Sequence, residues 1–207
     1  MKEVYIKGSR TIRYFVVCLF FIILFGVNTI NRAAWFLDFL ILMAVTIFLI
    51  GIRKRFEFSN VSLLCLTIFM VLNLIGWNYG MENVPLDEIM NLFNLVRNPY
   101  DRVVHFASGL LLFYPLKEIL QIKIKTKKNF MFFLTFLAIM GIAGIYEVLE
   151  WIGSQIISPA AAGVYLGLQG DSWDAQKDMI MAGLGSLFYI FLSFLYNLKT
   201  RFRKSGI

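Results

Sequence analysis

One histidine and two charged neighbours form the stretch of this sequence that is best suited to chemistry. His105 is the only histidine among 207 residues, and it lies four positions after Asp101 and three after Arg102. Residues three or four apart share one face of a helix, so the imidazole and the Asp101 carboxylate should be neighbours. The stretch opens an apolar segment, where charge is costly and usually has a function. Residues 98–106 are therefore the first part of a candidate site.

Two later stretches supply further acids at helical spacing. Glu147 and Glu150 are three apart, and Asp171, Asp174 and Asp178 are separated by three and four positions. Asp, Glu and His side chains are ligands for Zn²⁺, Mn²⁺ or Mg²⁺. A metal held there would activate a water molecule for hydrolysis of an ester or a phosphate.

Residue type suggests the role of each group in such a site. The metal ligands would come from all three stretches: Asp101, His105, Glu147, Asp174 and Asp178. His105 would act through the metal, and Glu147 or Glu150 would be the general base. Arg102 would steady an anionic lipid-linked substrate, with Asp171 further out.

The charges in this cluster do not balance. The six acids face only Arg102 and Lys177 among the basic residues, which leaves about four negative charges uncompensated. Like charges at short range in a low dielectric repel strongly. Either some carboxylates stay protonated or a cation lies among them. Without a metal, the same groups would suit a proton relay or a cation pathway.

Each of these residues also has a structural interpretation. Asp171 followed by Asp174 fits a helix N-cap with an acid three positions later, and Asp101 near a helix start favours the helix dipole. His105 fits a packed, hydrogen-bonded residue as well as a ligand. Glu147 is the hardest to explain in this way, because helix C-termini disfavour anions.

The composition places these stretches in a membrane protein. Hydrophobic residues make up 59% of the chain and charged residues 16%, against about a quarter charged in soluble domains. Blocks long enough to cross the hydrocarbon core predict a single integral membrane domain, 1–207, with spans at about 14–30, 33–52, 61–80, 99–120, 130–152 and 178–198. Outer connections follow at 81–98 and 153–177. Cys18 and Cys65 lie within apolar blocks, and we expect both to be packing residues.

The basic residues predict the orientation of the chain. Six spans put both termini on one side, which holds 16 Lys and Arg residues, while the other side holds four. The positive-inside rule then places both termini in the cytoplasm. The same distribution accounts for the net charge of +7 without nucleic acid as a partner, so the expected partner is the lipid bilayer. The predicted fold class is an all-α bundle of six transmembrane helices, N-in/C-in.

Three motifs resemble those of a known family. Asp-Arg-x-x-His-Phe, Tyr-Glu-x-x-Glu-Trp and Gly-Asp-x-Trp-Asp-x-x-x-Asp-Met occur at 101–106, 146–151 and 170–179. Together with six spans, they are similar to the YjdF-like bacterial inner-membrane proteins, and the resemblance covers most of the chain. It implies a location in the bacterial inner membrane and implies no reaction.

A weaker likeness reaches the VanZ-like membrane proteins. It matches Asp101, Arg102, His105, Glu147, Asp174 and Asp178 in kind. Arg102 stands where that family usually has Lys, and Glu150 stands where Gln is expected. This likeness implies a link to the cell envelope and to glycopeptide resistance.

The leading functional hypothesis is an acidic, His-containing and metal-binding site at the outer face. It would hydrolyse or modify an envelope lipid or a lipid-linked substrate. An ion- or proton-coupled transporter is the alternative, although the sequence shows neither paired broken helices nor an inverted repeat. A structural or accessory membrane protein would use the same cluster only to lock its helices together.

Overall fold

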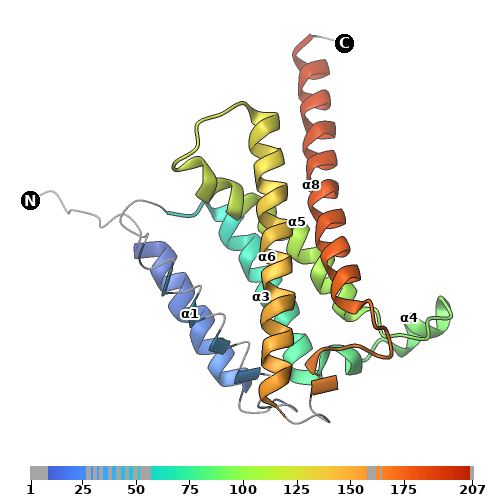
Figure 1. The fold of residues 1–207 in the computed structure, drawn as a ribbon. Helices are drawn as coiled ribbons and strands as arrows, with labels where there is room; N and C mark the ends of the chain where they lie inside the picture. The colour runs from blue at the N-terminus through green and yellow to red at the C-terminus, as the bar shows by residue number, and fades with distance from the viewer. Residues whose placement is uncertain are drawn as a thin grey trace, which may run out of the picture.

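The computed structural model describes residues 9–26, 57–157, 162–163 and 165–205, with isolated positions between 27 and 56. Within these ranges all secondary structure is helical, as the sequence predicts. The helices in chain order are α1 Ser9–Gly26, α3 Asn60–Tyr79, the short η2 Met81–Asn83, α4 Asp87–Leu92, α5 Tyr100–Gln121, α6 Lys128–Ile156 and α8 Asp174–Ser205 (Figure 1). The predicted span 33–52 lies outside the described residues except at single positions.

Four of the described helices are long and apolar enough to cross a membrane. They are Asn60–Tyr79, Tyr100–Gln121, Lys128–Ile156 and the Asp174–Leu198 part of α8. The predicted spans 61–80, 99–120, 130–152 and 178–198 each overlap one of them. A shorter apolar helix covers Arg13–Gly26 within α1. Large apolar side chains such as Phe191, Phe194 and Ile145 are exposed on these helices, as expected of a surface that faces lipid.

The crossing of α5 and α8 lies at the centre of the bundle. A Cβ atom on Gly109 would overlap the backbone of Ala182, and one on Gly185 would overlap the backbone of Phe106. Small residues let membrane helices approach this closely. The two glycines therefore set the distance between the helices that carry most of the candidate site.

The main apolar core joins α5 and α8 to α6. Phe113 is fully buried, and its ring is stacked on that of Tyr189 with 4.5 Å between centroids. Ile139 and Ala143 of α6 and Ala182 of α8 complete this buried cluster. Because three helices share one core, their polar ends are held in fixed relation to one another.

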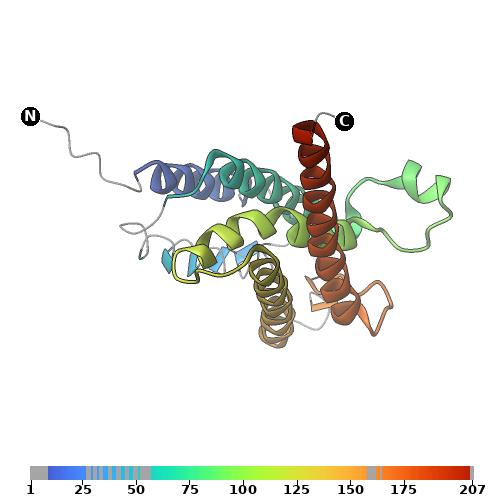
Figure 2. The ribbon, with the colours of Figure 1, turned by 90° about the horizontal axis from the view of Figure 1, so that it is seen from above.

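The beginning of α3 is tied to α5. Ser59 Oγ accepts a hydrogen bond from the Ser62 N–H at 3.2 Å and caps the helix. The Glu118 carboxylate on α5 accepts hydrogen bonds from the Ser62 hydroxyl at 2.6 Å and from the Ser59 N–H at 3.2 Å. On the other flank, Phe15 of α1 packs against Phe58, and α1 lies alongside α3 in Figure 2.

The connections at the Asp101 end of the bundle are joined by hydrogen bonds. The Asn98 N–H donates to Gln169 Oε1 at 2.8 Å, and Gln169 Nε2 donates to the Asn98 carbonyl at 3.3 Å. Asn98 Oδ1 also accepts the Tyr100 N–H at 3.0 Å, at the start of α5. The chain that precedes α8 is thus held over the first turn of α5, whereas α4 projects away from the bundle in Figures 1 and 2.

Candidate functional site

Three helices bring most of the predicted site residues together. Asp101 and His105 of α5 are buried, as are Asp174 and Asp178 of α8. The Glu147 side chain of α6 is only 10% exposed. Four carboxylates and one imidazole therefore share a largely water-free region, which is unusual without a functional or ionic reason.

His105 lies between two of these carboxylates. Its Nε2 atom is 3.5 Å from Asp101 Oδ1 and 3.6 Å from Glu147 Oε1. Both distances exceed those of good hydrogen bonds. Two ligand atoms that bind one tetrahedral Zn²⁺ at about 2.1 Å lie about 3.4 Å apart. The spacing therefore fits ligands around an ion.

A third residue completes a set of metal-type ligands. Asp101, His105 and Asp178 each offer one ligand atom, and these atoms all lie within 4.8 Å of one another. All three residues are buried. With Glu147 beside His105, the site offers one nitrogen and three carboxylate donors, a composition compatible with Zn²⁺ or Mn²⁺.

One carboxylate oxygen in this set lacks a hydrogen-bond donor among the described residues. Glu147 Oε1 is buried and accepts no hydrogen bond from the described part of the chain. Asp178 Oδ1, by contrast, lies 2.6 Å from Arg102 Nη1 in an ion pair. Burying an oxygen such as Glu147 Oε1 without a partner is costly, and a cation would remove that cost.

Arg102 reaches across from α5 to the start of α8. Its Nη2 atom lies 2.6 Å from Asp174 Oδ1 and 3.3 Å from Asp171 Oδ2, and Nη1 lies 2.6 Å from Asp178 Oδ1. Nη1 also donates to the Asp174 carbonyl at 2.9 Å. Both terminal nitrogens are thus occupied by α8. This geometry suits the positioning of acids better than contact with a substrate.

Arg97 supplies a second guanidinium to the cluster and is not among the predicted site residues. Its Nη1 atom lies 2.5 Å from Asp174 Oδ1, and its Nη2 atom lies 3.4 Å from Asp101 Oδ2. The same two nitrogens donate to the carbonyls of Leu168 at 3.2 Å and Gly167 at 3.1 Å. The available signal was the four-residue spacing between Arg97 and Asp101, which is typical of a helical ion pair.

The presence of Arg97 corrects the predicted charge balance. The four buried carboxylates carry four negative charges when ionised, and Arg97 and Arg102 supply two positive charges. Asp171 and Lys177 lie further out, with 2.6 Å between Asp171 Oδ2 and Lys177 Nζ, and their charges offset each other. With a neutral imidazole, the buried cluster has two uncompensated negative charges. One divalent cation would balance them.

Two charged groups outside the spanning segments have shifted pKa values. Burial lowers the pKa of Arg97, but the hydrogen bond and charge of Asp174 outweigh burial and raise it overall. The hydrogen bond from Lys177, followed by the one from the Trp173 N–H, lowers the pKa of Asp171 below its ordinary value. Both groups stay charged at neutral pH. Asp171 accepts the Trp173 N–H at 3.1 Å. Because α8 begins at Asp174, this bond lies in the turn before the helix, and the predicted N-cap with Asp174 three positions into the helix is wrong.

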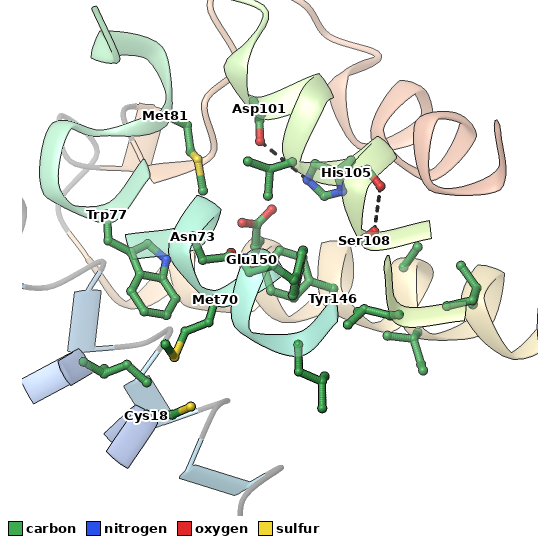
Figure 3. Close-up of a pocket in the computed structure, with 18 of the residues that line it drawn as sticks. Cys18, Met70, Asn73, Trp77, Met81, Asp101, His105, Ser108, Tyr146 and Glu150 are labelled. Carbon is green, nitrogen blue, oxygen red and sulfur yellow. Dashed lines mark hydrogen bonds and ion pairs between the residues drawn. The ribbon is translucent and has the colours of Figure 1, made fainter. Parts of the chain in front are cut away.

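An elongated cavity of about 290 Å³ adjoins the cluster (Figure 3). It lies between α1, α3, α5 and α6 and is lined mostly by apolar side chains. Asp101, His105 and Glu150 line one end, where Figure 3 shows them facing one another. Glu150 therefore faces the cavity and lies outside the compact ligand set. The site combines a charged end with an apolar chamber.

Comparisons with known proteins agree with the membrane character of the chain. The family model described as "Predicted membrane protein (DUF2238)" matches residues 11–199. The chain is 27% identical over 164 residues to "Inner membrane protein YjdF" of Escherichia coli (strain K12), which covers 78% of each protein. No solved structure matches. The resemblance to YjdF-like proteins is thereby confirmed, and the chain belongs to the DUF2238 family of predicted membrane proteins.

Proposed function

We propose that this protein is a membrane-embedded, metal-dependent enzyme that hydrolyses or modifies an envelope lipid or a lipid-linked substrate. One observation carries the proposal: the buried Glu147 Oε1 atom accepts no hydrogen bond from the described residues and lies beside His105. With its four carboxylates ionised, the buried cluster would also lack two positive charges. A divalent ion at that point would satisfy both the charge and the oxygen. The apolar cavity at the same point supports an amphiphilic substrate.

The roles in this proposal follow from the contacts of each residue. Asp101, His105 and Asp178 hold the ion, since their donor atoms all lie within 4.8 Å of one another. Glu147 joins them through Oε1, which lies 3.6 Å from His105 Nε2. Asp174 stays a ligand candidate through its second oxygen, while its Oδ1 atom receives both guanidiniums. Arg97 and Arg102 hold the acids of α8 in place. A mixed nitrogen and oxygen set favours Zn²⁺ or Mn²⁺ over Mg²⁺.

Glu150 is the residue best placed for general base catalysis. It lines the cavity opposite Asp101 and His105. Glu150 would take a proton from a water molecule whose pKa the ion would lower. The resulting hydroxide adds to the ester carbon or to phosphorus, and the bond to the leaving oxygen breaks. Glu150 then returns the proton to that oxygen.

The proposal includes six spans with both termini in the cytoplasm of a bacterial inner membrane. The distribution of basic residues supports it, as does the similarity to a protein named as an inner membrane protein. Reporter fusions at residues 2, 92, 125 and 205 would test the orientation, with cytoplasmic signals expected at all but residue 92.

Elemental analysis of the detergent-purified protein tests the metal site. We expect about one divalent transition metal per chain in the wild type, and loss of it in His105→Ala and Asp178→Asn. Asp87→Asn is the matched control, because Asp87 is an exposed acid of α4 outside the cluster. A folded wild-type protein without metal, or metal retained by both site variants, would contradict the proposal.

Two assays separate this proposal from its alternatives. Hydrolysis of lipid esters or phosphates in mixed micelles, lost in Glu150→Gln with the metal retained, would support the enzyme. Proton- or ion-dependent flux into proteoliposomes that contain metal-free protein would favour a transporter. Acids and a histidine within spanning helices also suit a transporter. Loss of stability alone in the cluster variants would indicate a structural role.

A further inference from the structure

The cavity beside the charged cluster has the form of a binding site for one lipid chain. We infer that it takes a single hydrocarbon chain of a glycerophospholipid, with the ester and phosphate groups at the Asp101, His105 and Glu150 end. The inference rests on the proposed function, because it names the class of substrate for the same site.

The polarity of the cavity wall changes along its length. On α5 the lining runs from Asp101 and His105 to Leu112. On α6 it runs in parallel from Glu150 to Ile139. Both helices therefore present their polar ends to the same end of the cavity. An amphiphile fits such a wall in one orientation only, with its head at the acids and its chain along the apolar part.

The length of the cavity matches the chain of one leaflet. The lining on α5 extends from Asp101 to Leu112, and that on α6 extends from Ile139 to Glu150. At 1.5 Å per residue, eleven steps correspond to roughly 16 Å. The hydrocarbon core of a bilayer is about 30 Å thick, so the cavity reaches about as deep as one leaflet. A lipid of the leaflet on the Asp101 side would need no change of depth to enter it.

The apolar part of the wall favours hydrocarbon over water or a soluble metabolite. Phe15, Leu66, Phe69 and Ile139 are among the lining residues. Apolar cavities of this kind stay dry and bind hydrocarbon, because a water molecule there lacks polar partners. A water-soluble phosphate compound would use only the charged end and leave most of the chamber empty.

Two cysteines give a matched pair of variants for the test. Cys18 is buried and lines the cavity, and Figure 3 shows it far from Asp101. Cys65 lies on α3 and is not part of the lining. Cys18→Phe would place a ring in the path of the chain without touching the cluster. Cys65→Phe makes the same change outside the cavity.

Fluorescence quenching can report the bound chain, since Trp77 lines the cavity. The test uses full-length protein in detergent with Trp35, Trp151 and Trp173 replaced by Phe. The probe is phosphatidylglycerol with a bromine-substituted acyl chain. We expect saturable quenching, unaffected by glycerol 3-phosphate as competitor. Cys18→Phe should weaken binding about tenfold or more, as overpacking does, and Cys65→Phe should bind like the wild type.

The outcomes separate this inference from the metal proposal. Equal binding by Cys18→Phe and the wild type, no saturable quenching, or full competition by glycerol 3-phosphate would overturn the inference. Elemental analysis of the same samples measures their metal content independently of lipid binding. Metal retained by Cys18→Phe with lipid binding lost would uphold both proposals. Lipid bound by a wild type that lacks metal would uphold the chain site and refute the metal site.

Discussion

Arg97 and Asp174 form a short ion pair, with 2.5 Å between Nη1 and Oδ1. The pair joins the chain that enters α5 to the first residue of α8. Asp174 Oδ1 is shared with Arg102, whose Nη2 atom lies 2.6 Å away. The same two guanidiniums also reach Asp178 at 2.6 Å and Asp101 at 3.4 Å, so the two arginines are shared among three of the buried acids.

Removing the Arg97 charge should destabilise the protein. Arg97→Gln leaves Asp174 with Arg102 alone and removes the contacts to the carbonyls of Gly167 and Leu168. We expect a loss of about 1.5–3 kcal/mol in the free energy of unfolding, as for hydrogen bonds to charged groups. Denaturant unfolding in detergent measures it. Arg32→Gln is the control, because Arg32 is exposed; an equal loss in both variants would contradict the assignment.

Gly109 should tolerate no side chain. In Gly109→Ala the new methyl group would overlap the backbone of Ala182 on α8. Overpacking of this kind costs about 1–3 kcal/mol. At Gly141 a Cβ atom would meet nothing within 4 Å, so Gly141→Ala should be neutral or slightly stabilising through helix propensity. The thermal unfolding temperature should therefore fall in Gly109→Ala and stay the same or rise slightly in Gly141→Ala. An equal fall in both variants would argue against close packing at Gly109.

Gly167 should affect the cluster through Asp101. A Cβ atom on Gly167 would lie 3.0 Å from Asp101 Oδ2, and its φ of +61° already disfavours other residues. Gly170 shares a positive φ, +83°, but a Cβ atom there has open space. We expect Gly167→Ala to lower metal content more than Gly170→Ala at comparable folded yield. Equal metal content would show that backbone strain alone matters at these positions.

The start of α8 should lose stability in acid through Asp171. Its pKa is lowered in the folded protein by Lys177 and by the Trp173 N–H. A group with a lowered folded pKa contributes stability above its unfolded pKa and loses it as pH falls toward the folded value. The wild type should thus exceed Asp171→Asn in protection of the Trp173 amide at neutral pH, and the difference should shrink below about pH 4.

Hydrogen exchange of that amide across the pH range measures the effect. Lys177→Gln removes the largest cause of the shift, so the loss of protection should begin at higher pH than in the wild type. Lys177→Arg retains the charge and should restore the wild-type profile. An identical profile in Lys177→Gln and the wild type would refute the role of this pair.

The family and the helical class could be predicted from the sequence because both depend on local patterns. Apolar blocks long enough to span a membrane are readable directly, and the helices found at 60–79 and 100–121 overlap two of them. The spacing of Asp101 to His105 also placed both on one helix face. The alternating direction of successive spans also predicted that the start of α5, the end of α6 and the start of α8 lie on the same side of the membrane.

Two features of the site could not be predicted from the sequence, because they depend on how the helices pack. Arg97 lies in a connection between predicted spans, and only the approach of Gly167 and Asp174 makes it part of the cluster. The cavity is likewise invisible in sequence, because its wall combines residues of four helices.

The reason for this division is physical. Hydropathy and helical periodicity are properties of consecutive residues, so the sequence by itself determined an all-helical membrane protein with acids and a histidine at matching helix ends. The number of uncompensated charges and the shape of the chamber depend on the rotation and separation of helices. Those are decided by contacts such as Gly109 against Ala182, between residues far apart in the chain.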